Sequence, residues 1–230
     1  MKTGWIAFEL PGYREHPATT TYTLFPYEEL PPVRVKPGEG FRWLESEPIK
    51  KGSLAEGTYS DGSRPDLGKL SDIVKSLEVT PPPAFMTFIN SLDLHRKVRS
   101  CTDCYLDVAD RAVKTEGGES GYLIHFLSDS QWCCHWYLHV SRSGGHSVVA
   151  SFDAYGFDGD AAGDEGNGTC RKVEIELEHE EIWLCSPTFT EFVYRFWLEN
   201  ELWFALTFEG EALTEEQEAY VGHYKKLYAK

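Results

Sequence analysis

The cysteines are the residues of this chain whose spacing could hold a metal ion. There are six of them, and Cys101 and Cys104 form a single CxxC motif with no second one later in the chain. Together with Cys133 and His135 they could build a tetrahedral zinc site. A structural zinc ribbon would need a second CxxC motif, and thiols of intracellular proteins usually pack as small apolar side chains. The spacing therefore favours free thiols and predicts no metal or cofactor, with a zinc-stabilised structural domain as an alternative.

Three histidines could take part in catalysis. A thiolate beside an imidazole is a strong nucleophile, and Cys133 and His135 point to the same face of a predicted strand. No third residue that would orient the pair can be identified, and the sequence has no phosphate-binding loop or nucleophile elbow. An enzyme would need a polar cleft where His125, His135 and His139 converge. We therefore expect no catalytic residues, and keep an enzyme built around these histidines as an alternative.

Acidic side chains are concentrated in two segments. The loop over 153–165 carries five of them between glycines and alanines, and their spacing does not fit a calcium-binding EF loop. The run 172–178 alternates apolar and polar residues, so its glutamates share a solvent-facing side. The expected partner-binding residues are Asp153, Asp158, Asp160, Asp164, Glu165, Glu174 and Glu176.

The overall charge limits the kind of partner. The chain has 22 Lys+Arg against 37 Asp+Glu, a formal net charge of −15, and its densest basic run, 95–99, is short. Such a surface repels nucleic acid but attracts basic proteins, although acidity can also serve solubility alone. No apolar run approaches the roughly 20 residues that span a bilayer. We expect a cytoplasmic protein with a protein partner and no contact with nucleic acid or membrane.

Five runs of residues predict a mainly antiparallel sheet, because they follow one another through short turns without intervening helices. The first run is apolar on both faces, which is typical of a central strand. Alternation in the second run places Trp132 and Trp136 on one face and His135 on the other. A glycine turn at 144–145 indicates a hairpin between the second and third runs. The five runs cover 121–128, 132–140, 146–152, 172–178 and 182–185.

The N-terminal part differs in composition from the rest. Residues 1–65 are rich in turn-forming proline and glycine, so they predict a loop-rich extension packed on a main domain over 66–230. The main domain begins with apolar residues at helical spacing over 67–77. After three consecutive prolines, a second helical pattern covers 85–92. Two short helices are therefore expected before the sheet.

Two further helices are expected after the sheet. Thr188 and Glu191 have the spacing of a capping box, and an aromatic stripe that must be buried follows them as far as Phe204. Thr214 and Gln217 repeat the capping signature ahead of an amphipathic C-terminal segment. The resulting fold class is α+β, with the sheet flanked by N-terminal and C-terminal helices.

Three segments together resemble a known family. They are the proline-led helix over 83–89, the apolar strands over 121–126 and 132–138, and the segment Thr-Phe-Thr-Glu-Phe that opens the helix at 188. This set is similar to the SUKH superfamily of Smi/Knr-like proteins, whose domains close with a Ser-Phe-x-Glu-Phe helix. The resemblance covers residues 66–206. One departure is that Asn90 is followed by Ser91, where members often have Asn-Gly.

The resemblance implies an α+β domain that acts by binding another protein. Many SUKH proteins serve bacteria as immunity proteins against toxins, and complementary charge would suit an acidic member to a basic toxin. We therefore expect a non-enzymatic protein-binding module of the immunity type. The alternatives are an enzyme with a polar cleft around His125, His135 and His139, or a zinc-stabilised structural domain.

Overall fold

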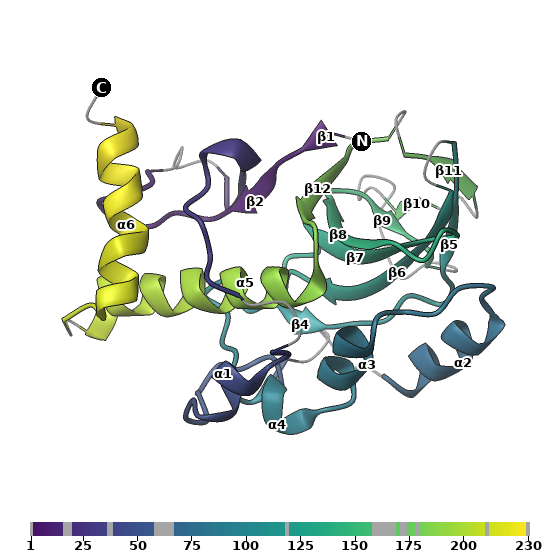
Figure 1. Cartoon of the computed structure of the whole chain (residues 1–230), viewed down its shortest axis with the longest axis horizontal. Helices are drawn as coiled ribbons and strands as arrows, with labels where there is room; N and C mark the ends of the chain where they lie inside the picture. Colours follow the sequence, from purple (N-terminus) through teal and green to yellow (C-terminus); the bar gives the residue numbers. More distant parts are fainter. Residues whose placement is uncertain are drawn as a thin grey trace.

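The computed structural model describes residues 2–15, 20–35, 39–57, 67–117, 120–157, 169–170, 174–177, 180–209 and 212–228. Helices and a curled mixed sheet make up this part of the chain, which confirms the α+β class (Figure 1). Long helices at one end and the sheet at the other give the molecule its long axis.

The main sheet has eight strands. In spatial order they are β1 (Lys2–Thr3), β12 (Ile182–Ser186), β8 (His146–Ser151), β7 (His135–Ser141), β6 (Gly121–Ser128), β5 (Val113–Glu116) and β11 (Glu174–Glu176), while β4 (Tyr105–Leu106) pairs with β6. Neighbours from β12 to β5 are antiparallel, but β1 is parallel to β12 and β11 is parallel to β5. The expectation of a mainly antiparallel sheet is therefore correct for the centre and wrong for both outer pairs.

The two parallel pairs have a topological cause. A mainly antiparallel sheet requires that consecutive runs lie side by side, as they do in hairpins. Instead, the chain leaves β8 and returns at the far edge of the sheet as β11, next to β5, before crossing back to form β12 beside β8. Short turns cannot make parallel pairs, because the chain has to cross from one end of the sheet to the other.

Two small pairings complete the strands. β2 (Trp5–Ala7) and β3 (Thr23–Phe25) are antiparallel, and β9 (Ala154–Tyr155) is parallel to β10 (Thr169–Cys170). The N-terminal residues thus contribute β1 to the main sheet and a separate hairpin-like pair beside it. The division of the chain at residue 66 stays a prediction.

Six α-helices occur among the described residues: α1 (Arg42–Glu45), α2 (Gly68–Ser76), α3 (Pro83–Ile89), α4 (Leu92–His95), α5 (Phe189–Phe204) and α6 (Glu215–Tyr228). A 3-10 turn, η1, covers Tyr27–Glu29, and a π-helical turn, η2, extends α5 over Ala205–Glu209. The four expected helical segments are confirmed, with α3 ending earlier than the expected 85–92 segment.

The expected capping box is complete at Thr214 and half formed at Thr188, whose N–H donates to the Ser186 hydroxyl at 3.5 Å. The Thr188 hydroxyl accepts a hydrogen bond from the Glu191 N–H at 3.2 Å at the start of α5. At the start of α6, the Thr214 hydroxyl accepts from the Gln217 N–H at 3.2 Å, and the Gln217 side chain accepts from the Thr214 N–H at 3.0 Å. These bonds satisfy N–H groups that the first helical turn leaves without a partner.

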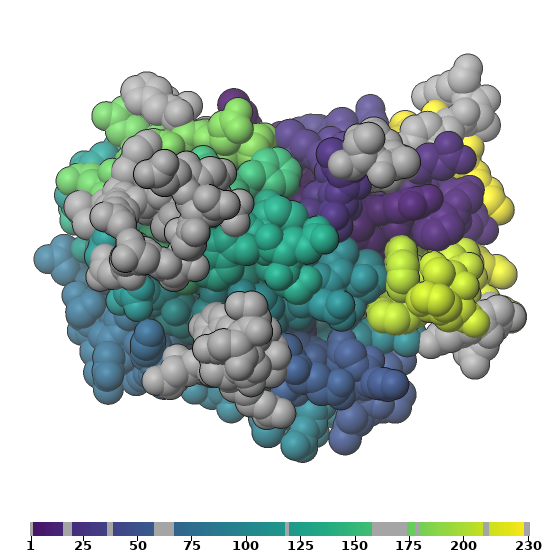
Figure 2. Space-filling view, turned by 180° about the vertical axis from the view of Figure 1, so that it is seen from behind, coloured from purple at the N-terminus to yellow at the C-terminus, as the bar shows by residue number. Residues whose placement is uncertain are grey.

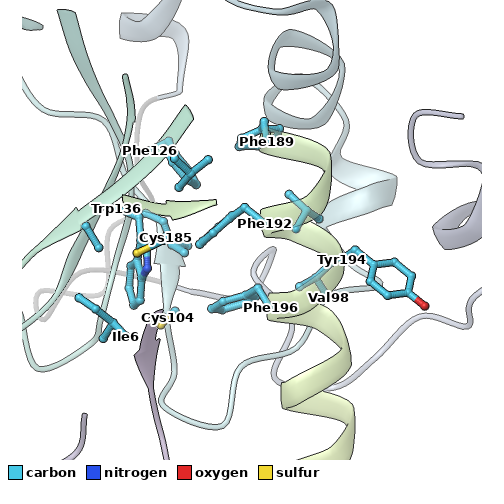
Figure 3. Packing of buried hydrophobic residues seen from close by; sticks show 14 of the residues in the cluster. Ile6, Val98, Cys104, Phe126, Trp136, Cys185, Phe189, Phe192, Tyr194 and Phe196 are labelled. Atoms are coloured by element: carbon cyan, nitrogen blue, oxygen red, sulfur yellow. The ribbon is translucent and has the colours of Figure 1, made fainter. Parts of the chain in front are cut away.

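The larger core lies between α5 and one face of the sheet. Phe189, Phe192 and Phe196 extend from α5 toward Phe126 and Trp136 of the sheet (Figure 3). The rings meet edge to face, with 5.3 Å between the centroids of Phe126 and Phe189 and 5.6 Å between those of Phe126 and Phe192. The aromatic stripe of α5 is thus buried over its first turns, as expected.

The opposite, concave face of the sheet encloses a second apolar cluster. Its members come from strands far apart in the sheet order, and they include Val113, Leu123, Tyr137, Val149, Ile175 and Ile182. Curling of the sheet brings these strands together. Trp132 also lies on this side, because its ring contacts His135 with 4.9 Å between centroids. Its backbone has a φ of 58°, which breaks the strand alternation and makes the expected orientation wrong.

A buried ion pair joins the N-terminal segment to α5. The guanidinium of Arg14 binds both carboxylate oxygens of Glu199 at 2.7 and 2.8 Å. Its other N–H groups donate to the Phe8 carbonyl oxygen, at 3.2 and 2.8 Å, and to the Tyr224 hydroxyl at 2.7 Å. All five N–H donors of the guanidinium therefore have an acceptor, and these bonds offset the free energy needed to remove its charge from water.

Glu199 is the centre of this network. Besides Arg14, it accepts hydrogen bonds from the Trp5 indole at 2.8 Å and the Tyr220 hydroxyl at 2.7 Å. Burial alone would raise the pKa of Glu199, but the charge and hydrogen bonds of Arg14 outweigh burial and hold the pKa below its usual value. The carboxylate thus stays ionised and ties β2, α5 and α6 together.

Replacing Glu199 tests this network. The substitution Glu199→Gln keeps the shape but leaves the Arg14 charge buried without a counterion, so we expect a loss of about 3–5 kcal/mol in the free energy of unfolding, measured in urea. The double variant Arg14→Met/Glu199→Leu removes both charges and should recover most of this loss. A Glu199→Gln protein as stable as the wild type would contradict the assignment.

Candidate partner-binding face

The predicted acidic residues are only partly described by the structure. Asp158, Asp160, Asp164 and Glu165 lie outside the described residues. Asp153, Glu174 and Glu176 lie within them, on two different elements. The loop and the strand therefore have to be considered separately.

Asp153 holds the start of its loop against the concave core. The Tyr137 hydroxyl donates to the Asp153 carbonyl oxygen at 3.3 Å and accepts from the Tyr155 N–H at 2.8 Å. The Asp153 N–H donates to the Ser151 hydroxyl at 3.0 Å. The side chain of Asp153 is half-buried. Its clearest role is thus the backbone conformation that follows β8.

Glu174 and Glu176 are exposed on β11, at the end of the sheet. The buried side chain of Ile175 between them points into the concave cluster. In the parallel pairing with β5, Glu174 lies opposite Lys114 and Glu176 lies opposite Glu116. The structure therefore brings both predicted glutamates together on one face and adds a third carboxylate that the sequence analysis did not include.

Lys114 links two of these carboxylates. Its ammonium group lies 2.6 Å from a carboxylate oxygen of Glu174 and also pairs with Glu116. Hydrogen bonding to Lys114 lowers the pKa of Glu116, and the same contact raises the pKa of Lys114. Glu176 faces Glu116 across the strands, and like charges directly opposite each other in a sheet are unfavourable.

The charged surface continues beyond the strands. The guanidinium of Arg142, just after β7, lies 3.7 Å from the carboxylate of Glu78. Hydrogen bonding to Tyr122 raises the pKa of Arg142, and the charges of Glu78 and Glu116 add to this effect. We name the whole set the acidic edge face: Glu78, Glu116, Glu174 and Glu176 with Lys114 and Arg142. Among the described residues, this set holds four carboxylates and two cations.

Sequence reasoning missed most of this face because it overlooked β5. The residues Val-Lys-Thr-Glu over 113–116 alternate buried and half-buried side chains in the structure. The same alternation is visible in the sequence, and it would have predicted a strand with Lys114 and Glu116 on its polar side. Nothing in the sequence predicts that this strand pairs with β11.

The histidine alternative involves a buried cluster. The hydroxyl of Ser128 lies 3.0 Å from His125 Nε2 and also 3.0 Å from His135 Nδ1. An Asp107 carboxylate oxygen lies 4.0 Å from His125 Nδ1. His139 is not part of this group, because its Nε2 lies 3.3 Å from the Thr115 hydroxyl. The structure therefore brings together two of the three histidines.

This cluster contains a serine hydroxyl, imidazoles and a carboxylate, which are the groups of a serine nucleophile site, but it is buried away from solvent. Ser128, His125 and His135 are each at most 2% exposed. The rings of Trp132 and Phe157 pack over His135. Burial lowers the pKa of both His125 and His135 to about 3, so both imidazoles are neutral. The Ser128 hydroxyl thus bridges one ring nitrogen of each histidine, while the buried His125 Nδ1 and His135 Nε2 have no hydrogen-bond partner among the described residues.

The thiols show no sign of reactivity. Burial raises the pKa of Cys104 to about 11 and that of Cys133 to about 12, which disfavours the thiolate. The Cys133 thiol donates to a carboxylate oxygen of Asp129 at 2.9 Å. Within the described ranges, no three His, Cys, Asp or Glu side chains are arranged to hold a metal ion. The Cys170 side chain is outside the described part.

A small aromatic surface lies at the far end of α5. Phe208 in the π-helical turn is 71% exposed, and its ring contacts those of Trp203 and Phe204, which are half-buried. Figure 2 shows the yellow-green end of α5 at the surface of the molecule. The expectation that the aromatic stripe is buried as far as Phe204 is therefore wrong for its last two residues, because α5 extends past the edge of the sheet.

No family model, curated protein or solved structure matches the chain. The similarity to SUKH proteins thus rests on the three sequence segments alone. No helix in the described residues is long and apolar enough to cross a bilayer.

The histidine cluster predicts a dependence of stability on pH. Because the pKa of His125 falls from 6.5 to about 3 on folding, the unfolded chain binds the extra proton between these values. The free energy of unfolding should therefore decrease as the pH falls from about 6.5 toward 3. In His125→Phe, the decrease in urea experiments should be shallower by about 1.4 kcal/mol per pH unit.

A control variant separates titration from packing. Phe157→Leu removes a ring that contacts His125 but no titratable group, so it should lower stability while keeping the wild-type slope. If His125→Phe shows the same slope as the wild type, the buried neutral imidazole is refuted.

Proposed function

We propose that this chain is a non-enzymatic protein-binding module that neutralises a basic partner, as an immunity protein does a toxin. The observation that carries the proposal is the acidic edge face. Its four carboxylates lie along one side of the sheet edge, with the described cations Lys114 and Arg142 among them. A basic protein surface would be attracted to this concentration of carboxylates.

The charge of the whole chain supports the same partner class. A net charge of −15 produces a long-range field that accelerates encounter with a positively charged protein. The exposed pairs of the acidic edge face would then fix the orientation of the complex. The immunity role comes from the resemblance to SUKH proteins, and this role and the cytoplasmic location expected from the sequence are both part of the proposal.

The first experiment uses candidate partners encoded next to this gene, where toxins of immunity proteins are normally found. The purified chain should bind one such gene product and suppress its toxicity on co-expression. Because exposed charges contribute, the affinity should fall as salt is raised from about 0.05 to 0.5 M. The proposal fails if no neighbouring gene product binds.

A variant with a matched control assigns the binding surface. Glu116→Gln/Glu174→Gln/Glu176→Gln removes three carboxylates of the acidic edge face without changing side-chain size, and we expect roughly tenfold weaker binding. Glu9→Gln/Glu29→Gln removes exposed carboxylates of the N-terminal segment and should bind like the wild type. Equal affinities for the two variants would exclude the acidic edge face as the binding surface.

A further inference from the structure

The two most exposed large apolar side chains of the described residues belong to segments that meet near the end of α5. Phe208, in the turn that extends α5, is 71% exposed, and Ile49 is 66% exposed. Lys50, the residue after Ile49, lies 2.7 Å from the carboxylate of Glu201, about two helical turns before Phe208. Exposed apolar side chains that gather in this way mark surfaces that bind another molecule.

Three aromatic rings form the centre of this surface. The ring of Phe208 contacts those of Trp203 and Phe204, with 5.4 and 6.4 Å between centroids. These rings lie in and beside the π-helical turn over Ala205–Glu209, and such turns are rare and often occur at functional sites. We name Ile49, Trp203, Phe204 and Phe208 the aromatic end surface.

The chain itself shows what such a ring can bind. The guanidinium of Arg99 lies over the Phe204 ring, with 4.0 Å between Cζ and the ring centroid. Its Nε and Nη2 atoms donate to the two carboxylate oxygens of Glu201, each at 2.9 Å. A planar guanidinium can thus stack on an aromatic ring while its N–H groups bind acceptors, which the compact ammonium group of lysine does not do.

We propose that the aromatic end surface binds an arginine side chain of a basic partner, whose guanidinium stacks on the rings of Phe208 and Trp203. This inference rests on the proposed function and adds a second contact, far along the molecule from the acidic edge face (Figure 1). Tryptophan attracts cations most strongly among the aromatic residues, and arginine makes such contacts more often than lysine. The exposed Ile49 side chain would pack against the methylene groups of the arginine.

The charges of the molecule favour a cation at this surface. A net charge of −15 attracts a basic protein over a long range. The two cations near the surface, Lys50 and Arg99, are held by Glu201, and their side chains are only 19% and 10% exposed. An incoming guanidinium therefore meets the exposed rings before it meets these cations.

A second copy of the chain is a poor occupant of the same surface. Four side chains, two of which are half-buried, fall well short of the roughly 800 Å² per partner that a stable interface buries. Both copies would also carry a net charge of −15, which adds repulsion. One arginine side chain matches the size of the surface better.

Two peptides test the inference on the full-length protein. Acetyl-hexa-arginine amide and acetyl-hexa-lysine amide carry equal charge, so the acidic chain attracts both, but arginine stacks better on aromatic rings. Affinities are measured by titration calorimetry, and the indole N–H signal of Trp203 is followed by NMR. Hexa-arginine should shift this signal and bind roughly threefold to fivefold more tightly than hexa-lysine.

A variant and a matched control locate the contact. Phe208→Ala should remove most of the preference for hexa-arginine and leave the affinity for hexa-lysine unchanged. Because Phe208 is exposed, its replacement should not alter the urea unfolding curve. Phe152→Ala shortens another aromatic side chain, 39% exposed on the sheet, and should keep the wild-type preference.

Equal affinities of the wild type for the two peptides would overturn the inference. So would a preference for hexa-arginine that survives Phe208→Ala, or a Trp203 signal that hexa-arginine does not shift. The partner assay with the neighbouring gene product distinguishes the two proposals. A partner that binds the wild type and Phe208→Ala equally well refutes only the present inference, whereas the absence of any binding gene product refutes the proposed function.

Discussion

The Arg14–Glu199 ion pair is the constraint on which one end of the molecule depends. Two buried charges are stable only if every donor and acceptor around them is satisfied. Here that requires β2, the loop after it, α5 and α6 to be in place at once, because Trp5, Phe8, Tyr220 and Tyr224 supply the remaining hydrogen bonds. Helix α5 is thus fixed by apolar packing in its first turns and by a polar network about one turn further along the same face.

The other end of the long axis also places glutamates beside basic side chains, but these groups lie at the surface. At the acidic edge face, Lys114 is shared between Glu116 and Glu174, and Glu176 faces a like charge. These groups are exposed to water, which screens their charges, so their ion pairs contribute little to stability. The buried pair therefore holds the fold, whereas the exposed set contributes little to it.

The local part of this architecture could be predicted from sequence, and the non-local part could not. The sequence predicts the caps at Thr188 and Thr214 and the periodic runs of α5 and β6, because each depends only on residues close together in the chain. Arg14 and Glu199 are 185 residues apart in the sequence. β11 and β5 are also far apart in the sequence, and nothing in their residue patterns identifies them as partners. No local period encodes such contacts, and the positive φ of Trp132 depends on its packing against His135 and Phe157.

An exposed strand edge is a hazard for any sheet protein, because identical edges can pair and start aggregation. Glutamates on both exposed positions of β11 counter that hazard by placing like charges together whenever two copies approach.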